Sequence, residues 1–289
     1  MTRIEKFGWK GEAAPGIGRI VSAHGDYYHL VADECPEGEI IARKKKSSFV
    51  RMKSVAPDDM KSRREQTGSQ SPLLPITGDF VRYRYNPQGE SLITEVLPRF
   101  SRFERKDPAA RRKAQTLAVN FDVLFVMMSL NENFSIPRLE RYFALAEDMG
   151  NAELVTVLTK RDLVEDSSAA CGLRGLFPGK TFIEISNLTG EGMDELNRFL
   201  SPRNTVAFVG SSGVGKSSLV NALAGSEWMA TGEIQQWSGK GRHTTTSREL
   251  LMLPSGAMVI DTPGVREIGM IGETEEISIK GESSHRYRK

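Results

Sequence analysis

Cysteine is scarce in this sequence of 289 residues, which contains only Cys35 and Cys171. The two lie far apart and form no Cys-x-x-Cys pair, so neither a disulfide framework nor a structural zinc site is predicted. Long hydrophobic runs are also missing, because the longest one, residues 123–128, is far too short to span a membrane. The first residues lack the apolar core of a targeting signal. These absences predict a soluble, cytoplasmic protein that does not associate with membranes.

Charge is nearly balanced over the whole chain but is distributed unevenly along it. The sequence has 39 lysines and arginines against 37 aspartates and glutamates, a net charge of +2 at pH 7. Residues 1–116 carry 22 basic and 15 acidic residues, whereas residues 117–289 carry 17 and 22. The length allows two modest domains, each with its own core. A basic first part favours contact with nucleic acid.

The first 98 residues have the pattern of a small β domain. Short apolar runs, nearly strictly alternating in residues 79–85, are separated by turn residues. Five such runs suit an OB-type barrel, a fold that binds oligonucleotides. The basic stretch 43–64 includes Phe49 and is suited to following a phosphate backbone, although a solvated loop has the same composition. The predicted strands are residues 16–22, 27–31, 38–43, 79–85 and 91–97.

A basic connector, residues 99–116, leads from the predicted barrel to a second domain over residues 117–270, and a polar tail follows over residues 271–289. In the second domain, strand-like apolar runs alternate with helical segments, which predicts a doubly wound α/β sheet. Ser135 is expected to cap one helix, with Pro137 in its first turn. The predicted apolar face of that helix is Leu139, Tyr142, Phe143, Ala146 and Met149. The predicted strands are residues 121–128, 153–158, 181–185, 205–209, 248–253 and 257–260.

A phosphate-binding signature lies in the second domain, where residues 210–218 match G-x-x-x-x-G-K-[ST] between a predicted strand and a predicted helix. Glycines in such a loop turn backbone N–H groups around a phosphate, which also lies at the positive end of the helix dipole. Lys216 is expected to reach the β- and γ-phosphates, and the Ser217 hydroxyl is expected to bind Mg²⁺. The predicted nucleotide-binding residues here are Gly210, Ser211, Ser212, Gly213, Val214, Gly215, Lys216, Ser217 and Ser218.

A second motif, Thr159-Lys160-Arg161-Asp162, follows a predicted strand, where open α/β sheets bind ligands. It resembles the base-reading motif of GTPases, whose aspartate accepts two hydrogen bonds from guanine N–H groups that adenine lacks. Asp162 would therefore select guanine, and the aliphatic stem of Lys160 would lie along the base. Thr159 stands where asparagine is usual and keeps a hydroxyl but no amide. All four residues are predicted to bind nucleotide, although alone they fit a solvated loop equally well.

The segment 186–190, Ser-Asn-Leu-Thr-Gly, strengthens the guanine interpretation. It follows a predicted strand and resembles the GTPase loop whose backbone supports the guanine carbonyl, with Ser186 predicted to bind nucleotide and Asn187 where alanine is usual. The base-reading motif here precedes the phosphate loop, whereas ordinary GTPases have the opposite order. The sequence therefore predicts a circularly permuted GTPase.

Two further segments complete the predicted site. A predicted strand ends in Asp261-Thr262-Pro263-Gly264. In GTPases such an aspartate holds a Mg²⁺-bound water, and the glycine N–H contacts the γ-phosphate. The polar stretch 239–246 is typical of a switch loop, in which Thr244, Thr245 or Thr246 supplies a second hydroxyl to Mg²⁺. Little separates the three, and an edge strand is the alternative. The predicted Mg²⁺-binding residues are Ser217, Thr245 and, through water, Asp261.

Val265 stands where many GTPases place a glutamine that orients the attacking water. A valine side chain makes no hydrogen bond, so intrinsic hydrolysis is predicted to be slow unless another group substitutes. His243, near the threonines of the predicted switch loop, is the candidate catalytic residue. A surface position or a contact with a partner is the alternative role for this histidine.

The predicted barrel, the motif order, the run Gly-Arg-His-Thr-Thr-Thr at 241–246 and the Asp-Thr-Pro-Gly motif together resemble the RsgA/YjeQ family. Residues 129–134 and 138–142 are similar to this family of circularly permuted GTPases as well, and the likeness extends from about residue 16 to residue 270. The resemblance implies an enzyme that uses GTP and Mg²⁺ and binds the small ribosomal subunit and its rRNA during late maturation. It also implies faster hydrolysis on the subunit and release afterwards. A monomer is expected.

The resemblance further implies a C-terminal module with a zinc site of three cysteines and one histidine. Residues 265–289 contain no cysteine, and His285 is the only histidine among them, so the ligands of that zinc site are missing. We expect GTP binding to persist and ribosome docking or stimulated hydrolysis to be weakened. One alternative is an RNA-binding remnant whose nucleotide site is uncoupled from hydrolysis. Another is a permuted GTPase of the large subunit, against which the barrel argues.

Overall fold

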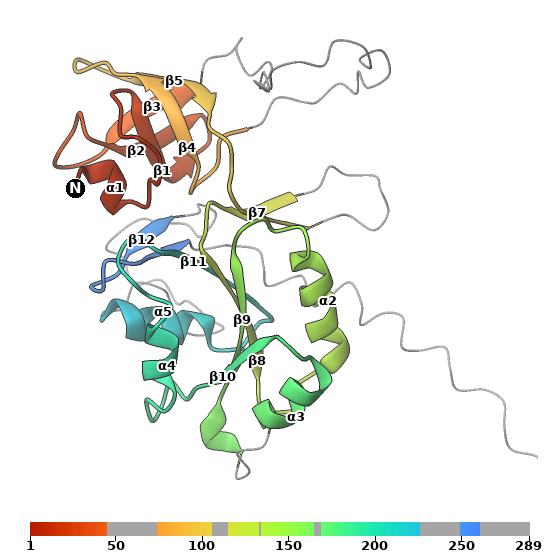
Figure 1. Cartoon of the computed structure of the whole chain (residues 1–289). Coiled ribbons are helices and arrows are strands. Elements are labelled where there is room, and N and C mark those ends of the chain that lie inside the picture. The colour runs from red at the N-terminus through yellow and green to blue at the C-terminus, as the bar shows by residue number, and fades with distance from the viewer. Residues whose placement is uncertain (45–73, 106–114, 133, 165–168, 226–248, 261–289) are drawn as a thin grey trace, which may run out of the picture.

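The computed structural model describes residues 1–44, 74–105, 115–132, 134–164, 169–225 and 249–260. In the first two of these ranges five strands close into a barrel in the order β1-β2-β3-β5-β4 (Figure 1). Neighbouring strands are antiparallel except β3 and β5, which are parallel. The predicted OB-type barrel is therefore confirmed. Its strands are β1 (Ile17–His24), β2 (Tyr27–Ala32), β3 (Ile40–Lys44), β4 (Phe80–Arg84) and β5 (Ser91–Val96).

A short helix, α1 (Arg3–Lys6), precedes the barrel. Its first turn is held by a capping box, in which the Thr2 hydroxyl accepts from the Glu5 N–H and the Glu5 carboxylate accepts from the Thr2 N–H. Ile4, fully buried, packs with Phe80 and other apolar residues at one end of the barrel. The helix is thus fixed to the barrel by a small apolar cluster that includes Ile17 of β1 and Phe80 of β4.

The second domain contains a six-stranded sheet in the order β10-β9-β8-β11-β13-β12. All neighbours are parallel except β12 and β13. Every residue of the central strand β8 is buried, as expected for a parallel strand covered on both faces. The strands are β8 (Val123–Ser129), β9 (Glu153–Thr159), β10 (Thr181–Glu184), β11 (Thr205–Gly210), β12 (Leu250–Met252) and β13 (Met258–Ile260).

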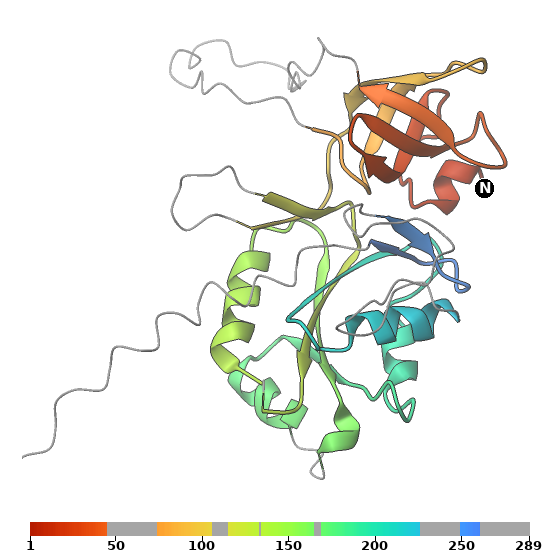
Figure 2. The same ribbon diagram turned by 180° about the vertical axis from the view of Figure 1, so that it is seen from behind.

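Helices cover both faces of this sheet, so the predicted doubly wound arrangement is confirmed (Figures 1 and 2). Alternate residues of β8 enter two separate cores: Leu124 and Met128 pack with α2 and α3, whereas Phe125 and Met127 pack with α4 and α5. The helical elements are α2 (Ile136–Ala146), the 3₁₀ turn η1 (Arg161–Leu163), α3 (Ala169–Leu176), α4 (Met193–Asn197) and α5 (Lys216–Ala224). None of the helices in the described ranges is long and apolar enough to cross a membrane.

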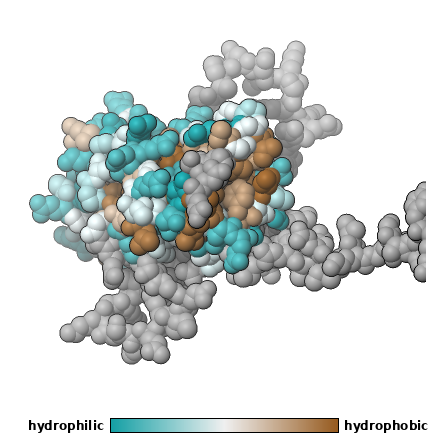
Figure 3. Space-filling model, turned by 90° about the horizontal axis from the view of Figure 1, so that it is seen from below, coloured by the Kyte–Doolittle hydropathy of each residue, from teal (hydrophilic) through white to brown (hydrophobic). Residues whose placement is uncertain are grey.

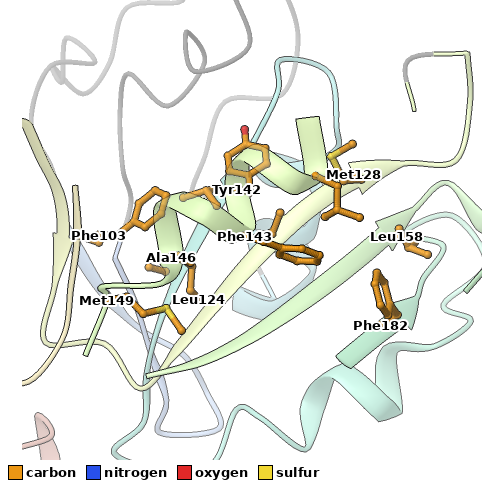
Figure 4. Close-up of a cluster of buried hydrophobic side chains, with 14 of the residues drawn as sticks. Phe103, Leu124, Met128, Tyr142, Phe143, Ala146, Met149, Leu158 and Phe182 are labelled. Atoms are coloured by element: carbon orange, nitrogen blue, oxygen red, sulfur yellow. The ribbon is translucent and has the colours of Figure 1, made fainter. Parts of the chain in front are cut away.

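Helix α2 forms as its sequence predicts. The Ser135 hydroxyl caps it by accepting a hydrogen bond from the Arg138 N–H at 3.4 Å, and a proline stands in the first turn. The predicted apolar face is confirmed, since all five of its residues are buried. Figure 4 shows Tyr142, Phe143 and Ala146 of this helix in one cluster with Leu124 of β8.

The basic connector contains secondary structure that its composition does not reveal. Strands β6 (Arg102–Arg105) and β7 (Gln115–Val119) pair antiparallel and form a separate two-stranded sheet. A bridge between Ser101 and Gly150 joins this region to the segment that leads into β9. The connector is therefore tied to the second domain by backbone pairing.

The barrel packs against the edge of the large sheet that ends in β12. Ser22 of the barrel forms a β-bridge with Glu249, and Val21 packs with Leu250 and Met258. An exposed edge strand presents unpaired N–H and C=O groups to other chains, and here the barrel covers part of that edge (Figure 1). The two domains thus share a continuous interface.

Arg19 lies in this interface and is fully buried. Its guanidinium donates hydrogen bonds to the carbonyl oxygens of Phe7 at 2.5 Å and Asn120 at 2.9 Å, and to the Thr205 hydroxyl at 2.8 Å. One acceptor precedes the barrel, one lies between β7 and β8, and one is the first residue of β11. A single side chain therefore links three segments that are distant in sequence.

Two carboxylates partly offset the burial of this charge. Burial lowers the pKa of Arg19 to about 10, against the opposing effect of Asp122 and Asp79, so the group stays protonated at neutral pH. Asp79 is itself buried and accepts two hydrogen bonds from Arg99, at 2.7 and 2.8 Å. Burial raises the pKa of Asp79, while Arg99 opposes that rise.

Replacing Arg19→Ala should lower the free energy of unfolding by roughly 3 kcal/mol, because it leaves buried carbonyl oxygens without donors and opens a cavity. Arg82→Ala is the matched control, since Arg82 is exposed on β4 and its ion pair with Glu95, at 3.5 Å, lies at the surface. Urea denaturation measures both variants. Equal losses of stability in the two would contradict the central role of Arg19.

Candidate nucleotide-binding site

The two motifs singled out in the sequence lie at the same end of the large sheet, the one at which its parallel strands have their carboxyl ends. Strands β9 and β11 flank β8 and run parallel to it, so the loops that follow them emerge at the carboxyl ends of the strands. The barrel contacts the opposite end, where Arg19 reaches Thr205 at the start of β11. The candidate site therefore faces away from the barrel. Viewed from below, the described surface exposes both hydrophilic and hydrophobic residues (Figure 3).

The phosphate loop, residues 210–215, has the backbone that its glycines permit. Gly213 and Gly215 have φ angles of +73° and +94°, a region that strains other residues. At Gly210 a Cβ atom would lie 2.8 Å from the carbonyl oxygen of Met127, so only glycine allows β11 to pack this closely on β8. Val214 points into the core and is buried. The loop is thus anchored by one apolar side chain and turned by two glycines.

Helix α5 begins directly after this loop, so its N-terminus lies at the carboxyl end of β11. Gly215 is the N-cap and has no side chain to cap the helix, and the Leu219 N–H donates to the Gly215 carbonyl at 2.9 Å. The first N–H groups of a helix have no partners within it and favour an anion. Lys216 and Ser217 are half-buried in this first turn, whereas Ser218 is exposed. The loop and the helix start together form a cradle suited to phosphate.

The base-reading loop follows β9 and holds its acidic residue by a hydrogen bond. Lys160 adopts a left-handed backbone, with φ +61° and ψ +40°, before η1 begins. The buried Ser186 hydroxyl donates to Asp162 Oδ1 at 2.6 Å and accepts from the N–H groups of Leu188 and Thr189 at 3.2 and 3.1 Å. These three bonds use the whole hydrogen-bonding capacity of a hydroxyl. Asp162 is exposed, so one carboxylate oxygen is oriented and the residue still faces the surface.

Arg161 holds the base-reading loop against the neighbouring strand. Its guanidinium pairs with Glu184 at 2.9 Å, and both side chains are largely buried. Its backbone N–H also donates to the Ile185 carbonyl at 3.1 Å. The structure therefore places this side chain among protein groups beside β10.

Two hydrogen bonds join the base-reading half of the site to the phosphate loop. The hydroxyl of Thr159, a fully buried residue, donates to the Val214 carbonyl at 2.7 Å. The Asn187 side-chain amide donates to the Gly215 carbonyl at 3.3 Å. The threonine in place of the usual asparagine thus keeps a donor for the phosphate loop. No role for Asn187 is predicted from the sequence, in which the only signal is an amide where alanine is usual.

A family model described as RsgA GTPase matches residues 96–271, more than half of the sequence. The chain belongs to the RsgA GTPase family. The match includes the connector strands β6 and β7 as well as the large sheet, and it contains both motifs of the candidate site.

Sequence similarity to known relatives supports this assignment to the family. The Small ribosomal subunit biogenesis GTPase RsgA 2 of Listeria monocytogenes serotype 4b is 38% identical over 259 residues, which cover 89% of this chain and 67% of that protein. RsgA 1 of Listeria innocua serovar 6a is 35% identical over 275 residues, which cover 92% of this chain and 72% of that protein. These likenesses extend through the barrel as well as the GTPase domain.

The fold is also that of solved RsgA-like structures. YjeQ from Thermotoga maritima matches 86% of this chain and 74% of its own, with 26% identity and a TM-score of 0.56. YloQ, a circularly permuted GTPase, matches with 21% identity and a TM-score of 0.53 over 88% of this chain and 74% of its own. This RsgA-family chain is therefore a circularly permuted GTPase with an N-terminal barrel, as its motif order predicts.

Several expected site residues lie outside the described residues. They are His243, Thr245, Asp261 and Gly264, so two of the three predicted Mg²⁺-binding residues are among them. Ser217 is the Mg²⁺ candidate that the structure places, in the first turn of α5. Within the described ranges, no group of three or more histidines, cysteines, aspartates or glutamates is arranged to hold a metal ion.

Thr159→Val should weaken nucleotide binding about tenfold and lower the free energy of unfolding by about 1 kcal/mol, because the buried Val214 carbonyl loses its donor. Thr156→Val is the matched control: Thr156 lies on the same strand, is fully buried, and its hydroxyl has no partner in the described part of the chain. Nucleotide titration and urea denaturation would be compared for both. Equal effects of the two substitutions on nucleotide affinity and on the free energy of unfolding would contradict this prediction.

Proposed function

We propose that this protein binds GTP with Mg²⁺ and hydrolyses it to GDP and phosphate at the carboxyl ends of the parallel strands of the large sheet. The observation that supports the proposal is the direct hydrogen bonding between the two loops, Thr159 with Val214 and Asn187 with Gly215, together with the bond from Ser186 to Asp162. Asp162 reads guanine, Lys160 lies along the base, and Thr159, Arg161 and Ser186 hold this half of the site. Residues 210–218 hold the phosphates.

The described residues fit Mg²⁺ as well as phosphate. This cation prefers oxygen ligands, and the Ser217 hydroxyl stands beside Lys216 at the N-terminus of α5. When bound, Mg²⁺ would neutralise charge on the β- and γ-phosphates. Lys216 would contribute a further positive charge to the same oxygens. The Thr245 hydroxyl, the Asp261 carboxylate and the Gly264 N–H complete the proposed site.

Hydrolysis requires a water molecule in line with the γ-phosphate and a group that orients it. We propose His243 for this role because Val265 has no hydrogen-bonding side chain. An imidazole nitrogen is able to accept a proton from water near neutral pH.

The relatives are named small ribosomal subunit biogenesis GTPases, and we propose the same process for this chain. We divide the chain into a barrel domain (residues 1–98), a basic connector (99–116), a GTPase domain (117–270) and a polar tail (271–289). The barrel domain is the proposed rRNA-binding part. On its surface the Arg43 guanidinium lies 4.2 Å from the centre of the exposed Tyr27 ring, and Tyr85 is also exposed. Arginine and aromatic side chains together suit stacking on bases. The protein would act as a cytoplasmic monomer.

Asp162→Asn should lower GDP affinity by roughly 100-fold and raise affinity for xanthosine diphosphate, measured by fluorescence competition. Xanthine carries a carbonyl where guanine carries its exocyclic amine, so an amide donor would suit it. Lys216→Ala is the companion variant and should weaken binding of both nucleotides without changing their ratio. A parent protein with equal affinity for GDP and ADP would overturn the guanine assignment.

His243→Ala should lower GTP turnover measured with small ribosomal subunits by about 100-fold, the usual size of a general-base contribution. GTP affinity should change less than threefold, since the imidazole acts on water. His24 is the last residue of β1 in the barrel, so His24→Ala is a control for general effects of removing a histidine. Stimulated turnover equal to that of the parent would remove His243 from the mechanism.

A further inference from the structure

Asn187 connects the base-reading loop to the first carbonyl of α5. Its amide nitrogen donates to the Gly215 oxygen at 3.3 Å, and the same oxygen accepts the helical hydrogen bond from the Leu219 N–H at 2.9 Å. The other amide atom, Asn187 Oδ1, is buried and has no hydrogen-bond partner in the described part of the structure. The side chain therefore makes one bond, to the phosphate loop, and leaves its acceptor unsatisfied.

The position of this bond determines the direction of a backbone N–H group. A trans peptide is planar, and its C=O and N–H point in opposite directions. Thr159 holds the Val214 carbonyl, so the Gly215 N–H points away from the threonine. Asn187 holds the Gly215 carbonyl in the same way, so the Lys216 N–H points away from the asparagine. Side chains of the base-reading half thus bond to two consecutive peptide planes of the phosphate loop, and the second of these planes is also held by the helical bond from the Leu219 N–H.

We propose that Asn187 is a positioning residue for phosphate binding, acting through the Gly215–Lys216 peptide and not through the base. This inference rests on the proposed function, because it assumes that the nucleotide phosphates occupy the cradle at α5. N–H groups at a helix N-terminus bind an anion best when they converge on it before it arrives. Asn187 supplies that preorganisation at the peptide next to the one that Thr159 holds.

A structural role and a positioning role predict opposite effects on stability. Removing the amide leaves the Gly215 oxygen with its helical bond from Leu219, so no buried acceptor is newly orphaned. It also removes Oδ1. This oxygen is buried and has no hydrogen-bond partner in the described part of the chain, which is unfavourable for the folded state. Asn187→Ala should therefore leave the unliganded protein as stable as the parent or slightly more stable, while phosphate binding becomes weaker.

The test measures GDP, GTP and ATP affinities by fluorescence, together with thermal unfolding without nucleotide. Asn187→Ala should weaken GDP and GTP binding about tenfold each, with the GTP-to-ATP preference and the unfolding temperature not reduced. Asn187→Asp keeps the size but turns a carboxylate oxygen toward the Gly215 carbonyl, and it should weaken binding further. Asn197→Ala, at the exposed C-terminal end of α4, is the matched control and should match the parent.

The possible outcomes separate this inference from the proposed function. A parent protein that binds no guanine nucleotide would refute the proposed function and the inference with it. Parent-like affinity in Asn187→Ala, with a parent that binds GDP, would refute the inference alone. A reduced GTP-to-ATP preference would assign Asn187 to the base. A lower unfolding temperature that accompanies the weaker binding would show a structural role instead.

Discussion

The arrangement of the two domains depends on the burial of Arg19. A guanidinium in the interior is unfavourable unless its donors are satisfied, and here Nη1 and Nη2 donate to three acceptors from three segments, whereas the buried Nε has no partner in the described part of the chain. The pKa is lowered to about 10 and still leaves the charge in place at neutral pH, with Asp122 and Asp79 nearby. A displacement of the barrel from β11 would separate this charge from the Thr205 hydroxyl and the Asn120 carbonyl. The interface therefore has one well-defined geometry, with apolar contacts around it.

Circular permutation changes the order of the motifs in the chain without separating them in space. Strand β9 delivers the base reader and β11 delivers the phosphate loop, and both flank β8. The site is then completed by contacts between side chains and backbone, Thr159 with Val214 and Asn187 with Gly215. These bonds fix the position of the two loops relative to each other, whichever of them comes first in the sequence.

Sequence patterns predicted the elements of this fold better than the contacts between them. The barrel, the central strands, α2 and the phosphate loop follow from local periodicity and capping, which short segments encode. Arg19 was not anticipated as an interior group, because a charged residue in a β-strand is ordinarily interpreted as facing solvent. The pairing of β6 with β7 was missed because the connector is mainly basic. The bond between Thr159 and Val214 joins residues 55 positions apart, a distance that no local pattern reports.

The hairpin of β12 and β13 is the element through which the barrel and the proposed γ-phosphate segments are connected. Residues 226–248, which include His243 and Thr245, lead into it at Glu249, and Asp261 follows its last residue, Ile260. The barrel bridges Glu249 from one side and packs on Ile260 in the shared apolar cluster. Both ends of the hairpin are therefore held by the barrel. Strand β13 also pairs in parallel with β11, the strand that leads to the phosphate loop, so the hairpin connects the barrel to that strand through backbone hydrogen bonds.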